Sequence, residues 1–160
     1  MFEFKQDRTS QIIAVTKVLT MITLNSKSGS LQSVMYLGRH FRKIGVGTRV
    51  MDNCFSACTL IALGGFNKKS GQSWLQVHIR ARFGVYRFKD IFEKKDYNSH
   101  DMYFAAEMAQ NRIWRLLKFL RFMEVPPKFL EMTLSVNSNG MRFLSPRELK
   151  QMKFEVVNSR

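Results

Sequence analysis

Two strand–turn–helix units follow one another in the first half of this chain and restrict the folds open to it. Residues 20–24 alternate like a strand, lead through a polar turn, and precede a helix whose apolar side chains share one face. Residues 47–51 then return as a strand and enter a second turn at Ser56. Strands linked by helices in this way pair in parallel with right-handed crossovers. The pattern predicts one α/β domain with a largely parallel sheet over residues 1–160.

Both turns follow the carboxyl ends of predicted strands, where parallel sheets place their binding sites. Ser56 opens a helix of small residues, so its hydroxyl lies beside free backbone N–H groups at the positive end of the helix dipole. A nucleophile elbow has this arrangement, and the next backbone N–H then stabilises an oxyanion. The alternative is an ordinary N-capping serine on a buried helix.

The two cysteines, Cys54 and Cys58, lie four positions apart and bracket this serine. At a junction between a loop and a helix, their separation falls within reach of a disulfide. Two small buried thiols are an equally good interpretation. A metal site is set aside, because this spacing supplies too few ligands.

The charge balance favours an acidic partner. The chain of 160 residues has 26 Lys and Arg against 12 Asp and Glu, a net charge of +14. Nucleic acid is the least favoured partner, because no motif of a nucleic-acid-binding fold accompanies the charge. No apolar run approaches the length of a transmembrane segment, and the polar start of the sequence does not read as a secretory signal.

The longest helix is expected over residues 99–124, with one apolar face that we assign to the core. Basic side chains recur at every third position of it: Arg112, Arg115, Lys118 and Arg121. We interpret them as a solvated face, with an acidic partner as the alternative. Farther on, Ser145 and Glu148 form the sequence pattern of a capping box at the start of the last helix.

Several short motifs then identify a resemblance through their order and spacing. They are LNSKSGS at residues 24–30, LGR at 37–39, TRV at 48–50, CFSAC at 54–58 and the glycine pair at 64–65. Together they resemble the Clp-protease/crotonase superfamily, most closely its periplasmic ClpP-like branch. The resemblance covers residues 20–157 and includes the long helix and the RFLSPREL segment at 142–149.

The resemblance implies repeated ββα and βαβ units around the sheet, and a serine hydrolase or peptidase. Such an enzyme cleaves peptide or acyl bonds through an acyl-enzyme and needs no cofactor. Periplasmic location and assembly into homo-oligomers are implied as well. In an oxidising compartment, Cys54 and Cys58 are expected to bridge and to brace the serine turn.

The resemblance also assigns site residues. Ser56 takes the nucleophile position, and the backbone N–H groups of Ala57 and Gly29 take the oxyanion hole. Where the family has Pro-Gly-Gly, this chain has Lys-Ser-Gly, so the oxyanion loop keeps only its second glycine. We expect the turns at residues 28–29 and 56–57 to face each other across one cleft.

The base position departs from the family. The residue types that surround the family's histidine match the surroundings of Tyr86, whereas His78 lies nearer to Ser56 in sequence but in a poorer match. If residues 78–86 formed one strand, these two side chains would lie roughly 26 Å apart, so only one can face Ser56. A neutral phenol is a poor base, since the reference pKa of tyrosine is near 10. An active enzyme therefore requires His78, and a tyrosine in the site means an inactive or altered one.

The acid position of the triad falls on Asn137, in a polar turn. An asparagine can orient an imidazole but cannot offset its charge, and we favour a plain turn here. With the serine kept and the other two positions altered, we expect a degenerate hydrolase homologue that is weakly active or inactive. The alternative is a non-catalytic ClpP-like binding or assembly domain for an acidic protein partner.

Overall fold

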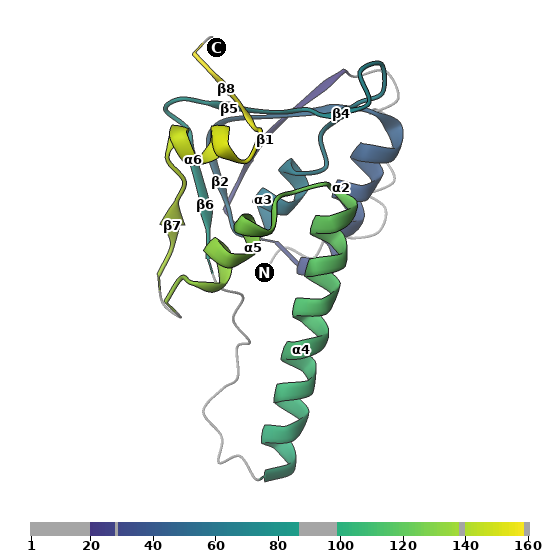
Figure 1. The fold of residues 1–160 in the computed structure, drawn as a ribbon, viewed down its shortest axis with the longest axis vertical. Coiled ribbons are helices and arrows are strands. Elements are labelled where there is room, and N and C mark those ends of the chain that lie inside the picture. Colours follow the sequence, from purple (N-terminus) through teal and green to yellow (C-terminus); the bar gives the residue numbers. More distant parts are fainter. Residues whose placement is uncertain (1–19, 28, 87–98, 138–139, 159–160) are drawn as a thin grey trace.

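The structure is a computed structural model, and it describes residues 20–27, 29–86, 99–137 and 140–158 (Figure 1). In chain order its elements are β1 (Met21–Ser26), α2 (Leu31–Ile44), β2 (Gly47–Phe55), α3 (Ala57–Ala62), β3 (Phe66–Asn67), β4 (Gln72–Ser73), β5 (Leu75–His78), β6 (Arg82–Val85), α4 (Ser99–Phe122), α5 (Pro127–Leu134), β7 (Arg142–Phe143), α6 (Pro146–Gln151) and β8 (Glu155–Val157). These elements give the expected mixed α/β domain.

Strand β2 lies at the centre of the sheet. One of its edges pairs in parallel with β1. The other edge pairs in parallel first with β5, at residues 48–50, and then with β6, at residues 53–55. β8 continues the sheet in parallel beyond β5, and β7 pairs antiparallel with β6. The predicted parallel sheet is confirmed, with β7 as its antiparallel strand.

Helix α2 forms where the apolar spacing predicted it. Its buried residues are Val34, Met35, Gly38 and Phe41, which fall on one face of the helix. Gly45 ends it in the left-handed region, with φ 77°, and donates its backbone N–H to the carbonyl of Phe41. A glycine suits this position because it has no Cβ to clash there.

Helix α3 packs directly against α2 through a pair of glycines. A Cβ added to Gly64, just after α3, would lie 2.3 Å from the carbonyl oxygen of Gly38, so only glycine fits this approach. On its other side, the Thr48 hydroxyl donates a 2.5 Å hydrogen bond to the carbonyl of Ala62. These two contacts fix the short helix between α2 and β2.

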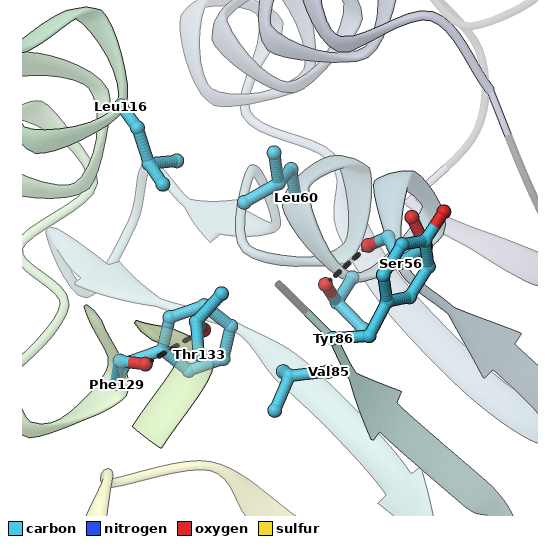
Figure 2. A pocket seen from close by; sticks show the side chains of 8 residues that line it. Ser56, Leu60, Val85, Tyr86, Leu116, Phe129 and Thr133 are labelled. Carbon is cyan, nitrogen blue, oxygen red and sulfur yellow. Dashed lines mark hydrogen bonds between the residues drawn. The ribbon is translucent and has the colours of Figure 1, made fainter. Parts of the chain in front are cut away.

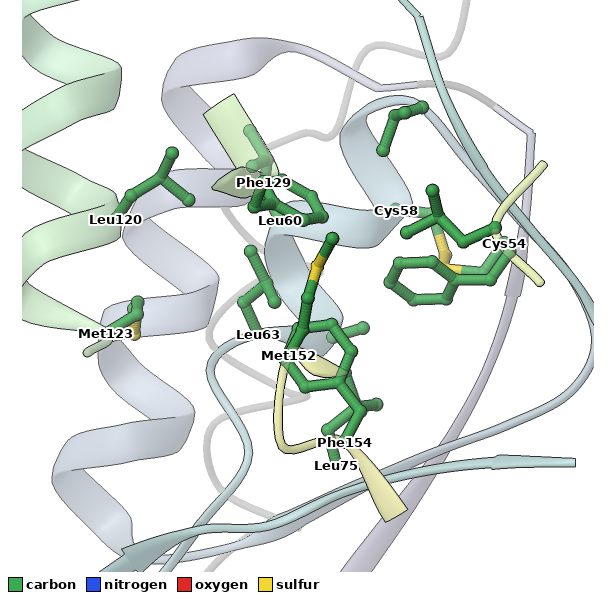
Figure 3. Close-up of a cluster of buried hydrophobic side chains, with 14 of the residues drawn as sticks. Cys54, Cys58, Leu60, Leu63, Leu75, Leu120, Met123, Phe129, Met152 and Phe154 are labelled. Carbon is green, nitrogen blue, oxygen red and sulfur yellow. A yellow bond between two sulfur atoms is a disulfide. The ribbon is translucent and has the colours of Figure 1, made fainter. Parts of the chain in front are cut away.

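One apolar core joins the sheet to the helices, and Figure 3 shows part of it around α3. Leu60 of α3, Leu120 of α4 and Phe129 of α5 are all at most 3% exposed. Met152 and Phe154, from the C-terminal segment, close the same cluster. Segments far apart in the sequence thus support the helix that follows Ser56.

The long helix α4 is only partly core, which corrects the sequence interpretation. Its buried residues are Leu116, Phe119 and Leu120, all in its C-terminal half. Tyr103, near its start, is 73% exposed, and Figure 1 shows this half extending past the rest of the domain. The apolar periodicity predicted the helix, but it could not show that the rest of the domain packs only against the C-terminal half of it.

The predicted capping box at the start of α6 is confirmed. The Ser145 hydroxyl accepts from the Glu148 backbone N–H, and the Glu148 carboxylate accepts from the Ser145 backbone N–H at 2.8 Å. Arg142 adds a 2.6 Å ion pair to the same carboxylate. The Ser145 hydrogen bonds, with Arg142, hold the pKa of Glu148 below its ordinary value.

Candidate active site

Ser56 occupies a sharp turn between β2 and α3. Its φ of 57° and ψ of −121° are unusual for a residue with a side chain and carry a conformational cost. The backbone is held on both sides: the Ser56 N–H donates to the Gly84 carbonyl at 2.9 Å, and its carbonyl accepts from the Thr59 N–H at 3.0 Å. The Ser56 side chain makes no capping hydrogen bond, so the alternative of an ordinary N-cap is wrong.

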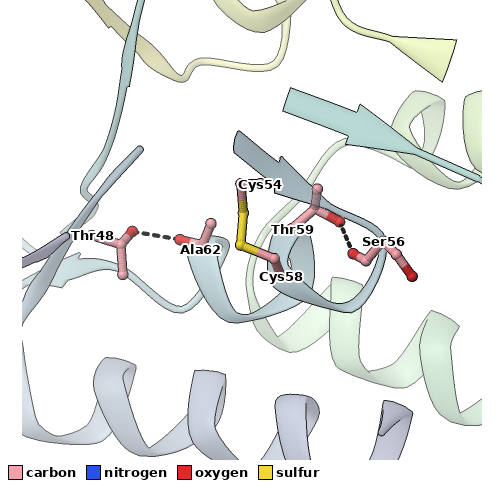
Figure 4. The surroundings of a disulfide bond; sticks show 6 residues. All are labelled: Thr48, Cys54, Ser56, Cys58, Thr59 and Ala62. Atoms are coloured by element: carbon pink, nitrogen blue, oxygen red, sulfur yellow. Dashed lines mark hydrogen bonds between the residues drawn. A yellow bond between two sulfur atoms is a disulfide. The ribbon is translucent and has the colours of Figure 1, made fainter. Parts of the chain in front are cut away.

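A disulfide brackets this serine. Cys54, at the end of β2, bonds to Cys58, in the first turn of α3, with a Cα–Cα distance of 5.2 Å (Figure 4). Both half-cystines are fully buried. The sequence left a bridge and two free thiols open, and the structure contains the bridge. The disulfide links the two segments that flank Ser56.

The two predicted turns meet at one cavity. Gly29, Ser56 and Ala57 line a cavity of about 490 Å³. A Cβ added to Gly29 would lie 3.3 Å from the Cβ of Ala57, so the turns are in contact. The expectation that they face each other is confirmed for these residues, and Ser28 lies outside the described residues.

Tyr86 lies beside Ser56. It follows β6 directly and lines the large cavity together with Ser56 and Gly29. It also lines a small apolar recess with Ser56, Leu60 and Phe129 (Figure 2). No hydrogen bond joins the two hydroxyls in the part of the chain that the structure describes. The structure therefore brings the tyrosine, as the family pattern suggested, to the serine.

His78 does not reach the site, which corrects the prediction that it is the base. It ends β5, and the register of β2 places it beside residue 51, five positions before Ser56. At about 3.3 Å for each residue, the two are separated by roughly 16 Å along the sheet. Its Nδ1 accepts a 3.2 Å hydrogen bond from the Arg80 N–H, and it lines a separate cavity with Ile79 and Asn158.

The physical reason is a break that the sequence pattern concealed. Residues 78–86 are not one strand, since the Ala81 N–H donates to the His78 carbonyl and closes a turn between β5 and β6. Both strands then lie end to end on the same edge of β2. Only the second one reaches the level of the serine.

Asn137 is exposed and does not line the Ser56 cavity. Its carbonyl accepts from the Gly140 N–H at 2.9 Å, in a polar turn. The favoured interpretation of a plain turn agrees with this position. The structure brings neither Asn137 nor His78 to the serine.

The other two histidines lie elsewhere. The Nε2 atom of His40, on α2, is buried without a hydrogen-bond partner among the described residues. Burial lowers the pKa of His40, and the nearby Lys43 lowers it further. His100 is exposed at the start of α4. Neither lines the Ser56 cavity.

Helix α4 contributes a wall that sequence reasoning missed. Met108, Asn111, Arg112 and Arg115 line the cavity at spacings of three, four and seven, which is one face of a helix. The sequence analysis placed both arginines on a solvated stripe. The spacing indicated that these residues share one face of the helix. The sequence near them does not show that this face borders the cavity.

Residues 20–27, 29–86, 99–137 and 140–158 contain no group of three His, Cys, Asp or Glu side chains that could hold a metal ion. In the same ranges, no helix has the length and apolar character needed to cross a bilayer. The polar groups that line the Ser56 cavity include the side chains of Ser56, Tyr86 and the two arginines.

Comparison with solved structures gives the fold. A ClpP1 mutant from Listeria monocytogenes superposes with a TM-score of 0.62 at 13% sequence identity, over 96% of this chain and 84% of that chain. No model of a protein family matches the chain. No curated protein sequence matches it either. The chain has a ClpP-like fold.

Proposed function

We propose that this protein is a ClpP-like serine hydrolase homologue with a degenerate triad, acting weakly or not at all on peptide or acyl bonds. One observation carries the proposal: Ser56 is held in a strained turn, next to the start of α3, and lines a cavity of ligand size. Strain of this kind persists where the surrounding structure imposes it, and it is frequent at functional sites.

The backbone N–H groups of Ala57 and Gly29 would act as the oxyanion hole. The contact between the two turns supports this role, since an oxyanion needs donors from both sides of the acyl carbon. The altered Lys-Ser-Gly loop keeps the glycine at the position that contacts Ala57.

Tyr86 would stand where an active relative has its base. A serine hydroxyl needs a base within hydrogen-bond reach to become a nucleophile near neutral pH. With no histidine among the residues that line the cavity, the expected acyl transfer is slow. The periplasmic resemblance and the buried disulfide together support an exported protein.

A fluorophosphonate probe tests this proposal. Prolonged incubation should give slow labelling, with the adduct on Ser56 by mass spectrometry, and Ser56→Ala should abolish it. His78→Gln should label like the wild type. Labelling that survives Ser56→Ala, or that disappears in folded His78→Gln, would contradict the assignment of the site.

The second candidate function is a non-catalytic domain that binds an acidic partner. It is favoured by a tyrosine, Tyr86, beside Ser56 and by two arginines in the lining of the cavity. Complete absence of labelling, together with binding of acidic ligands that depends on Arg115, would select it. Homo-oligomerisation belongs to both proposals and is measured by light scattering.

A further inference from the structure

Among the residues that the structure describes, the charged side chains that line the Ser56 cavity are of one sign. Its lining residues are Gly29, Ser30, Leu31, Gln32, Met35, Ser56, Ala57, Tyr86, Met108, Asn111, Arg112 and Arg115. This set contains two arginines and no carboxylate. The acidic residues of α4 are Asp101 and Glu107, and neither lines the cavity.

The two arginines belong to the part of the cavity lining that α4 provides. Arg112 and Arg115 are three residues apart on α4, so their guanidinium groups project from neighbouring positions on one helix face. Arg112 is half-buried and Arg115 is exposed at the edge of the cavity. The other wall is the first turn of α2, which has no acidic side chain and no side-chain cap on Ser30. Its backbone N–H groups add to the positive potential.

Ser56 lies in the same cavity. The residue is 7% exposed, and its side chain makes no hydrogen bond to any residue that the structure describes. A ligand that enters the cavity would therefore meet the Ser56 hydroxyl as well as the Arg115 guanidinium.

We propose that the Ser56 cavity selects acyl compounds that carry an anionic group, and that Arg115 is the specificity determinant. The acyl carbonyl would lie at Ser56, and the anionic group, a carboxylate or a phosphate, would accept hydrogen bonds from the Arg115 guanidinium. This inference rests on the proposed function, because it names the substrate class of that same site.

Equilibrium binding tests the inference without any turnover. Three fluorescent ligands share one acyl chain that ends in a carboxylate, a neutral carboxamide or a phosphate ester, and their affinities are measured by fluorescence anisotropy. Wild-type protein should bind the carboxylate about five- to tenfold more tightly than the carboxamide at low salt. The preference should shrink in 0.5 M salt. Comparing the carboxylate with the phosphate shows which anion is the better fit.

Matched charge reversals locate the effect. Arg115→Glu should weaken binding of the carboxylate ligand about tenfold or more and leave the carboxamide within about twofold. Arg121→Glu makes the same change on the same helix, outside the cavity lining, and should leave both affinities within about twofold. Equal affinities for the charged and neutral ligands, or equal effects of the two reversals, would overturn the inference.

The result is separable from the fluorophosphonate test. Labelling of Ser56 without any anion preference rejects the inference and keeps the hydrolase. An anion preference that depends on Arg115 without labelling keeps the cavity specificity, excludes a weakly active hydrolase and selects the non-catalytic binding domain.

Discussion

The two sides of the Ser56 cavity are built by different means. We define the nucleophile side as the β2–α3 turn with Gly29. Three features hold its geometry: the strained torsion angles of Ser56, the disulfide, and the close contact between the two turns. On the base side, which we define as the end of β6 with Tyr86, a single side chain lies beside Ser56. Under the proposed function, the site keeps its nucleophile geometry while the residue needed to activate the serine is replaced.

The strongest way to break the nucleophile side is to push α3 away from α2. Gly64→Ala places a Cβ 2.3 Å from the Gly38 carbonyl oxygen, a backbone atom that cannot move aside easily. We expect a loss of about 3 kcal/mol in the free energy of unfolding. Urea denaturation measures it. Gly140→Ala is the control, because its new Cβ would meet nothing closer than 3.5 Å, and an equal loss in both variants would contradict the account.

Removing the disulfide should have the next largest effect. The double variant Cys54→Ala/Cys58→Ala frees the five-residue segment that holds Ser56, and a loop of this length corresponds to about 2 kcal/mol. Thermal unfolding of wild type with and without reductant separates loss of the bond from loss of the sulfur atoms. A reduced protein that is as stable as the oxidised one would show that the bond does not brace the turn.

A substitution in the α6 capping box, away from both sides of the cavity, serves as a reference for the two sides. Glu148→Gln removes the charged half of the α6 capping box and should cost about 1 kcal/mol at neutral pH. Because the folded protein lowers the pKa of Glu148, this stability is present above the unfolded pKa and is lost as the pH falls through the folded one. The difference between wild type and variant should therefore vanish in acid. Fluorophosphonate labelling of Ser56 should stay unchanged, and a changed rate would link the cap to the site.

Tyr86→Phe should have the smallest effect. It removes only a hydroxyl that has no hydrogen bond among residues 20–27, 29–86, 99–137 and 140–158. We expect a change in stability below about 0.5 kcal/mol and a labelling rate within about twofold of wild type. A large fall in the labelling rate would show that the phenol itself takes part in the chemistry.

The nucleophile side was readable from the sequence because its determinants are local. The spacing of Cys54, Ser56 and Cys58 and the glycines near them encode a turn within a few residues. The sheet was predictable for the same reason, since β1, α2 and β2 follow one another directly. In both regions, the residues that form the sequence pattern are also the residues that contact one another in the structure.

Two other features, the positions of His78 and Arg115 relative to Ser56, were not readable from the sequence because they depend on distant contacts. The assignment of His78 failed where a turn at residues 79–81 splits the segment and sets both strands end to end on β2. Arg115 is exposed, as the solvated face predicted, but the sequence did not show that it also lines the cavity, because only the packing of the C-terminal half of α4 brings it there. The periodicity of a sequence shows which residues share a helix face, but it does not show which part of the protein that face contacts.

The most direct test of the central claim places a base where the site lacks one. Tyr86→His should raise the rate of fluorophosphonate labelling at Ser56 at least about tenfold over wild type, with a pH profile that follows one imidazole, because a positioned base contributes about a hundredfold or more. The added Ser56→Ala change should abolish that gain. Folded Tyr86→His protein with the wild-type rate, or wild-type protein that already labels as fast as the variant, would contradict a competent nucleophile without its base.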